Sequence, residues 1–394
     1  MKETQKLIPK RRFREFMDDG AWEQRELGNI ADIVGGGTPS TSIIGYWNGD
    51  IDWYAPAEIG EQIFVHRSQK KITELGLHNS SAKILPVGTV LFTSRAGIGN
   101  TAILAKEGAT NQGFQSIVPR KDGLDSYFIF SRAHELKRYG ETIGAGSTFV
   151  EVSGKQMAKM PIFTPEMSEQ KLIGQFFAVI DNLITLQQRK LEKIQNLKSA
   201  YLSKMFPKDG EKYPELRFAG FTDAWELRKL GEITNIKTGS SDLQDAVVDG
   251  EYPFFVRSEN VERSNRYIFD GEAILIPGEG RIGDIYHYVN GKFDYHQRVY
   301  KISNFAEADI DGKFVLYYLQ QNFKSHALTF TVKATVDSLR LPMLVDFEIK
   351  LPRLEEQQDI GNFFSNLDNL ITLHQRKLDK LKSIKQAYLN EMFV

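Results

Sequence analysis

The chain contains an internal duplication, which constrains its possible folds more than any other feature of the sequence. A block from Glu169 to Phe206 recurs from Glu356 to Phe393, at an offset of 187 residues. A second pair of matching segments surrounds Trp22 and Trp225, at an offset of 203 residues. The matched positions of the first block are Glu169-Gln170, Ile173-Gly174, Phe176-Phe177, Asp181 to Leu186, Gln188 to Leu191, Tyr201-Leu202 and Met205-Phe206. The chain is therefore a tandem repeat of two copies.

The two copies differ in length and sequence between these matching ends. Only faint similarity survives there: Leu91-Phe92 to Gly99 resembles Leu275-Ile276 to Gly283, and Asn111-Gln112 corresponds to His296-Gln297. Each half is thus a variable region framed by near-identical segments. Matched frames around divergent inserts indicate one scaffold that presents two different binding surfaces.

The variable regions are predicted to be mixed α/β domains. Residues 22–165 and 225–352 contain short runs of Val, Ile, Phe, Tyr and Thr that are broken by Gly, Pro, Asn and Asp, which is typical of strands and turns. Helical stretches are expected among them at 127–139 and 312–325.

Residues 168–206 and 356–394 have apolar side chains at helical spacing. No proline or glycine interrupts the segment from Asp181 to Met205, so a rise of ~1.5 Å per residue predicts a rod of roughly 38 Å. An amphipathic helix of this length requires a partner along its length, and the simplest partner is its own repeat. An antiparallel pair would relate the halves by a pseudo-twofold axis; the alternative is that each helix packs on its own domain.

The sequence therefore predicts an α+β fold with two mixed α/β domains, each followed by a long helix, the two helices pairing as an antiparallel coiled coil. The predicted boundaries are 1–166 for the first domain, 167–207 for the first helix, 208–354 for the second domain and 355–394 for the second helix.

Composition narrows the classes of function. The absence of cysteine excludes disulfides, cysteine nucleophiles and thiolate metal sites, and it fits a cytoplasmic protein. The sequence has neither a secretory signal nor an apolar run of about eighteen residues, so no membrane is expected. No histidine lies in a metal-ligand spacing. The net charge of −1 means that a DNA-binding chain must gather its positive charge on one face.

Motifs that carry catalysis are missing from the sequence. Gly278 to Gly283 matches GxGxxG, but a strand pattern follows it where a dinucleotide site needs a helix, so a turn between strands is predicted. Gly35 to Thr41 lacks the Gly-Lys-Ser/Thr of a P-loop. The chain has no amino-methyltransferase tetrapeptide, no Gly-x-Ser-x-Gly and no acidic cluster spaced as in a metal nuclease. We therefore expect a binding protein with no catalytic residues.

If DNA is the ligand, the candidate reading residues are polar and basic side chains at the predicted turns. Arginine can pair with guanine, and asparagine or glutamine with adenine, whereas lysine more often contacts phosphate. The candidates are Thr38, Ser40, Thr41, Arg67, Ser94, Arg95, Asn111, Gln112 and Lys155 in the first domain, and Arg257, Ser258, Asn260, Arg263, Arg281, His296, Gln297, Arg298, Lys333 and Arg340 in the second.

Residues repeated in the frames are candidates for packing between domain and helix, or for a partner surface. Trp22 and Trp225 are assigned to packing. The candidate partner-interface residues are Phe176, Phe177, Arg189, Lys190, Phe363, Phe364, Arg376 and Lys377.

The plan of variable domain, helix, variable domain, helix resembles the specificity subunit of Type I restriction–modification systems, the HsdS family. The resemblance covers essentially the whole chain. One departure is that Thr238-Gly239-Ser240-Ser241 stands in the second half where the first has Gly36-Gly37-Thr38-Pro39-Ser40. The residues that carry the resemblance are Ala21-Trp22 to Leu27-Gly28, Gly36 to Ser40, Glu169-Gln170 to Phe177 and Asp181 to Ile184, with their second-half counterparts.

The resemblance implies a non-catalytic subunit whose two target recognition domains each read one half of a gapped sequence in double-stranded DNA. The helices would act as a spacer and as the dock for two modification subunits, which bring S-adenosylmethionine. Restriction subunits, where present, would add ATP- and Mg-dependent chemistry, and the chain itself would need no cofactor. Three alternatives remain open: a duplicated protein-binding scaffold, a self-contained methyltransferase or nuclease with divergent motifs, and a repressor-like DNA binder that works alone.

Overall fold

The computed structural model describes residues 7–95, 97–144, 151–305, 309–330 and 338–394. The chain forms two compact units: unit 1 comprises Met1–Gln187 with Lys377–Val394, and unit 2 comprises Gln188–Arg376. Each unit therefore contains one variable domain together with parts of two long helices, α6 (Met167–Met205) and α10 (Leu354–Met392).

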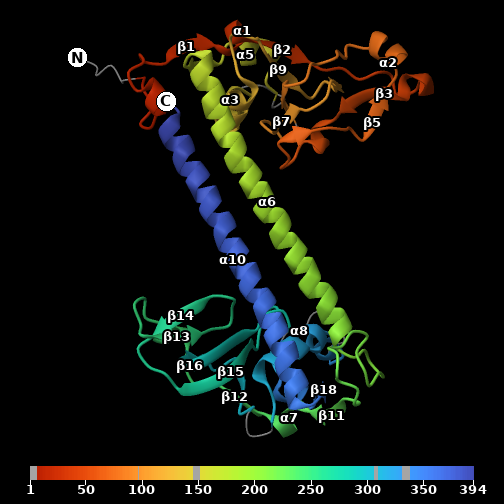
Figure 1. Cartoon of the computed structure of the whole chain (residues 1–394), viewed down its shortest axis with the longest axis vertical. Coiled ribbons are helices and arrows are strands. Elements are labelled where there is room, and N and C mark those ends of the chain that lie inside the picture. The colour runs from red at the N-terminus through yellow and green to blue at the C-terminus, as the bar shows by residue number, and fades with distance from the viewer. Residues whose placement is uncertain (1–6, 96, 145–150, 306–308, 331–337) are drawn as a thin grey trace. The chain divides into compact units, whose positions relative to one another are not determined.

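Unit 1 is built on a five-stranded sheet, a three-stranded sheet and a two-stranded ribbon (Figure 1). In the ribbon, β1 (Glu23–Glu26) pairs antiparallel with β10 (Pro161–Thr164), so the first and last strands of the domain lie side by side. The five-stranded sheet has the order β2 (Ala31–Gly35), β9 (Gln115–Pro119), β6 (Val90–Phe92), β7 (Thr101–Leu104), β4 (Phe64–Val65), and the three-stranded sheet has the order β5 (Lys70–Ile72), β3 (Trp47–Tyr54), β8 (Ala109–Thr110).

Short helices complete unit 1. They are η1 (Arg14–Phe16), α1 (Leu27–Ile30), η2 (Ile44–Tyr46), η3 (Pro56–Glu58), α2 (Glu74–His78), α3 (Ser126–Ser131), α4 (Ala133–Gly144) and α5 (Gly154–Ala158). Asp125 begins α3 because its carboxylate accepts hydrogen bonds from the backbone N–H groups of Tyr127 and Phe128. The single helix predicted over 127–139 is thus two helices, α3 and α4. The break lies at Arg132, whose side chain is buried and donates a hydrogen bond to the carbonyl of Phe163 at 2.5 Å.

Unit 2 repeats the ribbon and replaces the two sheets of unit 1 with one. Strand β11 (Glu226–Lys229) pairs antiparallel with β18 (Glu348–Leu351). The six-stranded sheet has the order β12 (Asn235–Thr238), β17 (Val299–Ser303), β15 (Phe269–Pro277), β16 (His287–Tyr295), β13 (Tyr252–Phe255), β14 (Val261–Ser264). The helices are α7 (Leu230–Ile233), η4 (Leu243–Asp245), α8 (Gly312–Leu328) and α9 (Leu341–Val345).

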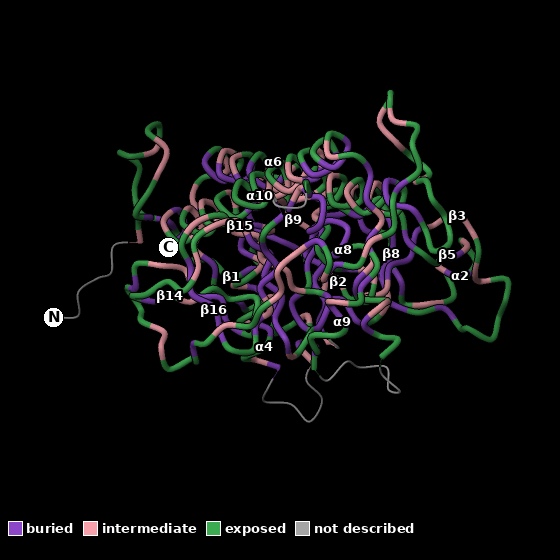
Figure 2. The backbone as a smooth tube through the Cα atoms, turned by 90° about the horizontal axis from the view of Figure 1, so that it is seen from below, coloured by how far each residue is buried: buried purple, intermediate pink, exposed green. Residues whose placement is uncertain are grey.

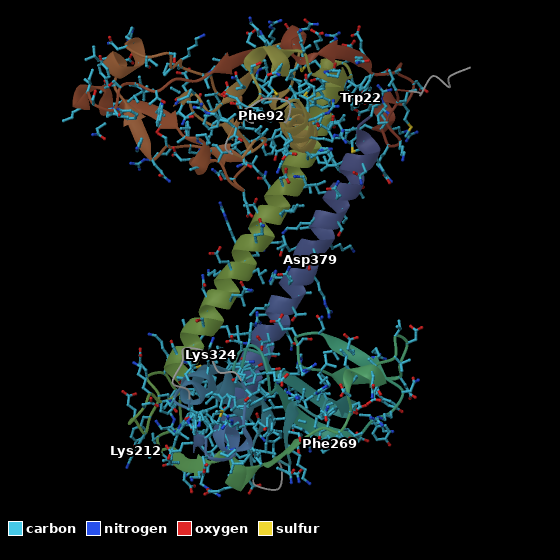
Figure 3. All side chains as sticks on the ribbon, turned by 180° about the vertical axis from the view of Figure 1, so that it is seen from behind. Trp22, Phe92, Lys212, Phe269, Lys324 and Asp379 are labelled. Atoms are coloured by element: carbon cyan, nitrogen blue, oxygen red, sulfur yellow. The ribbon has the colours of Figure 1, made fainter. Side chains whose placement is uncertain are left out.

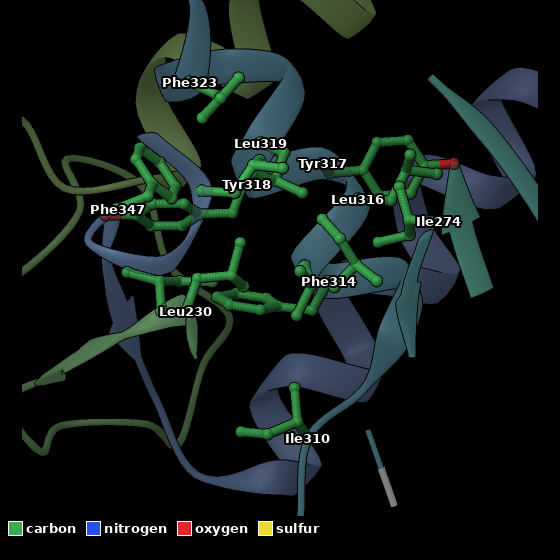
Figure 4. Close-up of a cluster of buried hydrophobic side chains, with 14 of the residues drawn as sticks. Leu230, Ile274, Ile310, Phe314, Leu316, Tyr317, Tyr318, Leu319, Phe323 and Phe347 are labelled. Carbon is green, nitrogen blue, oxygen red and sulfur yellow. The ribbon is translucent and has the colours of Figure 1, made fainter. Parts of the chain in front are cut away.

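Helix α8 supplies much of the core of unit 2. Phe314, Tyr318 and Phe323 are buried against Leu230 and Phe347, and Figure 4 shows these side chains converging. Figure 2 shows that the interior segments are buried, whereas the outlying loops are exposed. The glycine-rich segment from Gly278 to Gly283 lies between β15 and β16, so the predicted turn between strands is confirmed.

The two long helices each contain 39 residues, about 58 Å at ~1.5 Å per residue. Within unit 1, Asp181 of α6 forms an ion pair with Lys385 of α10 at 2.6 Å, and the rings of Phe176 and Tyr388 lie 4.9 Å apart. Residue numbers rise along α6 as they fall along α10 at these contacts. The two segments of unit 1 therefore run antiparallel.

Unit 2 contains the same contacts with the roles of the helices exchanged. Asp368 of α10 forms an ion pair with Lys198 of α6 at 2.6 Å, and the rings of Phe363 and Tyr201 lie 5.0 Å apart. The repeated residues thus make equivalent contacts in both units. The division of the chain into four segments at 166, 207 and 354 stays a prediction.

Candidate nucleic-acid interface

Three loops of unit 1 contain most of the predicted DNA-reading residues of the first domain. The first follows β2, the second follows β6, and the third connects β8 to β9. Backbone hydrogen bonds join them: the N–H of Gly37 donates to Thr110 at 2.9 Å, and the N–H of Ser94 donates to Gly113 at 2.8 Å. The predicted residues in these loops are Thr38, Ser40, Thr41, Ser94, Arg95, Asn111 and Gln112.

Unit 2 has the same loop arrangement: its first loop follows β12, its second connects β15 to β16, and its third connects β16 to β17. The N–H of Gly278 donates to the carbonyl of Arg298 at 2.8 Å, as Ser94 does to Gly113 in unit 1. The carbonyl of Gly278 accepts from the N–H of Leu339 at 2.8 Å, as Ser94 accepts from Val152 at 3.0 Å. One backbone scaffold therefore supports both sets of candidate residues.

A glycine stands where the first loop of each unit passes over a strand end. An added Cβ would lie 2.0 Å from the carbonyl oxygen of Asn111 at Gly36, and 1.9 Å from that of Tyr295 at Gly239. Only glycine allows this close approach. The turn that begins at Gly239 therefore has the same placement as the turn at Gly36, although the sequences around them differ.

An exposed glutamine projects from the third loop of each unit and is held by the first loop. The hydroxyl of Thr38 donates to Oε1 of Gln112 in unit 1. In unit 2, Nε2 of Gln297 donates to Oδ2 of Asp242 at 3.0 Å. Both amides keep further donor and acceptor capacity, which adenine recognition requires.

Arginines and acidic residues alternate on the loops of unit 2. Glu279 accepts hydrogen bonds from Nη1 of Arg257, at 2.9 Å, and from Nη1 of Arg298. Arg281 forms an ion pair with Glu259. Glu279 and Arg298 also line a pocket of about 200 Å³, whose other lining residues are Thr238, Gly278, Gln297, Tyr300, Ser338 and Leu339.

A buried histidine supports the third loop of unit 2. Nδ1 of His296 accepts from the backbone N–H of Arg298 at 2.9 Å, so Nε2 carries the proton and donates to Asp242 at 3.3 Å. The pKa of Asp242 is lowered, first by the backbone N–H of Leu243 and then by His296. Because His296 is 1% exposed, its side chain shapes the loop and does not face a ligand. Ser94 is likewise fully buried.

The remaining predicted residues lie elsewhere. Arg67 is exposed between β4 and β5, and the guanidinium of Arg263 donates to the carbonyls of Gly250 and Glu251 at 2.9 Å. Lys155 lies in α5, three residues after Val152, whose N–H donates to Ser94. Arg340 precedes α9 and follows Leu339, whose N–H donates to Gly278. Ser258 and Asn260 are exposed beside Glu259, and Lys333 lies outside the described residues.

The acidic partners Glu279, Asp242 and Glu259 were not among the predicted site residues. The internal repeat could have identified one of them, Glu279. Aligning Leu91-Phe92 with Leu275-Ile276 places Glu279 opposite Arg95, which was predicted. The other two could not be identified, because their role depends on which arginine or glutamine each one contacts.

The predicted partner-interface residues divide into three groups. Phe177 and Phe364 are fully buried in their own units, so they serve the cores and not an exposed surface; this corrects their assignment. Phe176 and Phe363 are half-buried between domain and helix. Arg189, Lys190, Arg376 and Lys377 are exposed on the long helices.

The described residues form neither a metal-binding cluster nor a membrane-spanning helix. Among them, no group of three or more His, Cys, Asp or Glu residues is arranged to hold a metal ion. None of the described helices combines the length and apolar character needed to cross a membrane.

Comparison with known proteins gives consistent matches. The family model described as the Type I restriction modification DNA specificity domain matches residues 20–196 and 222–383. The Type I restriction enzyme MjaIX specificity subunit of Methanocaldococcus jannaschii is 34% identical over an alignment of 407 positions, which covers 94% of this chain and 92% of that protein. The MjaVIII specificity subunit of the same organism is 23% identical over 73% of this chain and 74% of that protein.

One solved structure shows the same fold. It is the S subunit of a Type I restriction–modification system from M. genitalium, with a TM-score of 0.71 and 16% sequence identity. The match covers 98% of this chain and 99% of that chain. The two-domain α+β architecture predicted from the sequence is therefore confirmed.

Proposed function

This chain belongs to the Type I restriction–modification DNA specificity family, and from that premise we propose that each variable domain reads one half of a gapped, two-part DNA target. The chain is a non-catalytic specificity subunit of a Type I restriction–modification system. Unit 1 and unit 2 would present the first and second target recognition domain, respectively.

The main support for a two-part target is that both units repeat the same loop backbone but place different side chains on it. Gly36 and Gly239 make the same close approach, and Ser94 and Gly278 make the same pair of backbone hydrogen bonds. The exposed side chains on these loops nevertheless differ between the units. Equal scaffolds with different surfaces suit two readers of different sequences, since specificity is read by hydrogen bonds to base edges.

The two long helices would form an antiparallel coiled coil, with a pseudo-twofold axis that relates the two halves. Support comes from the reciprocal contacts inside the units, where Asp181 binds Lys385 and Asp368 binds Lys198. A rigid spacer would hold the readers at a fixed separation, and linked readers gain affinity through effective concentration.

Specificity subunits assemble with the other subunits of a restriction–modification system and bind DNA. We propose that this chain binds two modification subunits, through surfaces that include Arg189, Lys190, Arg376 and Lys377. These subunits would hold S-adenosylmethionine and methylate adenine, and restriction subunits, where present, would use ATP and Mg²⁺. The chain itself would hold no cofactor and would act in the cytoplasm, where the DNA is.

The decisive experiment maps methylated adenine in DNA from cells that express this chain with its modification subunit. The control cells express the modification subunit alone. We expect methylation at one gapped, two-part motif, present only with this chain. A continuous motif, or methylation that this chain does not change, would reject two readers and favour a protein-binding scaffold.

A further inference from the structure

One backbone position carries opposite charges in the two units. The preceding residue, Ser94 or Gly278, is fixed by the same two backbone hydrogen bonds in each unit. The next residue is Arg95 in unit 1 and Glu279 in unit 2, and each forms an isolated β-bridge, with Glu151 and Ser338 respectively. Arg95 and Glu279 are therefore structural equivalents with opposite charges.

Glu279 lies between two arginines. Its Oε2 accepts from Nη1 of Arg257 at 2.9 Å, and its Oε1 accepts from Nη1 of Arg298. Within the part of the chain that the structure describes, Nε and Nη2 of both arginines have no hydrogen-bond partner. Both guanidinium groups remain open to solvent, with side chains 45% and 59% exposed, while that of Glu279 is 28% exposed.

A carboxylate in this place has two effects on the arginines. It offsets the repulsion between two neighbouring positive charges, and it holds each guanidinium by a single nitrogen. The remaining donors of a guanidinium match the O6 and N7 acceptors of guanine in the major groove. A reading group works best when a neighbouring side chain fixes its orientation before the ligand arrives.

We propose that Glu279 is a specificity-determining positioning residue of unit 2, which orients Arg257 and Arg298 so that their free donors read guanine in the second half of the target. This inference rests on the proposed function. It implies that the second half-site contains at least one G·C pair whose recognition depends on Glu279.

The charge of Glu279 makes the proposal separable from a simple structural role. Removing the carboxylate leaves two unpaired arginines, so general attraction to DNA phosphates should increase. Discrimination between base pairs should decrease, because the guanidinium groups lose their fixed orientation. A variant that merely unfolded unit 2 would weaken both kinds of binding.

The test uses the complex of the full chain with its modification subunits, as the unaltered protein and as Glu279→Gln. Glu348→Gln is the matched control, since it removes the same charge from an exposed position of β18 in the two-stranded ribbon. Two measurements are made for each: the methylated-adenine motif, and binding to duplexes with single substitutions in each half-site at several salt concentrations.

For Glu279→Gln we expect the preference for guanine to fall by about tenfold or more at one or more positions of the second half-site. The first half-site should be unchanged. The slope of log K against log salt should become more negative by about 1. Glu348→Gln should change neither quantity. Arg257→Lys or Arg298→Lys should lower the preference at the same position, because lysine lacks the rigid planar fork of donors that arginine presents.

Three results would overturn the inference while leaving the two-reader function intact. They are a gapped motif without a G·C pair in its second half, full guanine preference in Glu279→Gln, and a loss in Glu279→Gln that neither lysine variant shares, which would mean that Glu279 reads a cytosine directly. Absence of any gapped motif with the unaltered chain would reject the proposed function and this inference together.

Discussion

The guanidinium of Arg12 forms two hydrogen bonds with the carboxylate of Glu169, at 2.7 and 2.6 Å, where the chain entering unit 1 crosses the start of α6. Both side chains are almost completely buried, with 6% and 1% exposed. Arg217 and Glu356 repeat this pair in unit 2 at 2.6 and 2.7 Å. The pairs tie each domain to the helix that follows it.

Breaking one of these pairs should destabilise its unit strongly. Arg12→Ala leaves the Glu169 carboxylate buried without its partner, which typically costs about 3–5 kcal/mol. Arg11→Ala is the control, because Arg11 pairs with Glu391 at an exposed site, where the loss of stability should be much smaller. Denaturant unfolding of the two variants measures the difference. Equal losses of stability would show that the buried pair is unimportant.

The end of each repeated helix completes the core of a unit. In unit 1 the ring of Phe393 stacks on Phe177 at 5.7 Å and meets Trp22 edge-on at 6.0 Å; Figure 3 shows Trp22 beside this end of α10. In unit 2, Phe206 stacks on Phe364 at 5.9 Å and meets Trp225 at 6.3 Å.

Phe393→Ala should therefore destabilise unit 1 by about 3–5 kcal/mol, the usual cost of truncating a buried phenylalanine. Val394→Ala is the matched control and should have little effect, because this residue is 37% exposed. Thermal unfolding of both variants, followed by circular dichroism, measures the difference. A Tm unchanged in Phe393→Ala would mean that the aromatic cluster is not part of the stable core.

Lys301 should make unit 2 more stable as the pH rises. It is 4% exposed, lies over the ring of Phe269 at 3.6 Å and donates to the hydroxyl of Ser303 at 2.7 Å. Burial lowers the pKa of Lys301 to about 8, with a smaller contribution from Lys237. Between pH 8 and about 10.4 the unfolded chain binds the proton that the folded chain has lost, so stability increases with pH across this window and is independent of this group below it.

The measurement is the free energy of unfolding at several pH values, for the unaltered chain and for Lys301→Met. The methionine variant should be more stable at pH 7, by about 1–3 kcal/mol, and should lack the rise above pH 8. A rise that persists in Lys301→Met would assign it to another group.

The long helices and the two mixed domains were predictable because they depend on local patterns. Apolar spacing predicted helices over 168–206 and 356–394, and α6 and α10 begin at Met167 and Leu354. The break between α3 and α4 was not predictable, because the buried Arg132 depends on the carbonyl of Phe163 and on Glu135, and the contact with Phe163 spans 31 positions of sequence.

The candidate site was predictable in its location but not in its chemistry. The weak similarity around Leu91 and Leu275 correctly placed two equivalent loops, since backbone geometry repeats with the frame. The contact of Glu279 with Arg257 and Arg298 joins three loops, and such side-chain geometry is not encoded in any local spacing.

Gly36 offers a direct test of the loop scaffold in unit 1. A Cβ at this position would lie 2.0 Å from the carbonyl oxygen of Asn111 and 2.4 Å from that of Thr110, so Gly36→Ala must push the first loop away from the third. Displacement of about 1 Å is enough to remove directed hydrogen bonds, and Thr38 and Gln112 lie on the two loops concerned. We expect methylation of the target to fall by about tenfold or more.

Gly45→Ala is the matched control for Gly36→Ala. A Cβ on Gly45 meets no atom within 4 Å, and the residue lies in η2, away from the strand end that Gly36 crosses. The clash at Gly36 reaches Thr110, the buried last residue of β8, so circular dichroism of the purified chains checks that both variants fold. Normal methylation by Gly36→Ala would show that the first loop of unit 1 does not contribute to reading DNA, and it would remove Thr38, Ser40 and Thr41 from the candidate interface together.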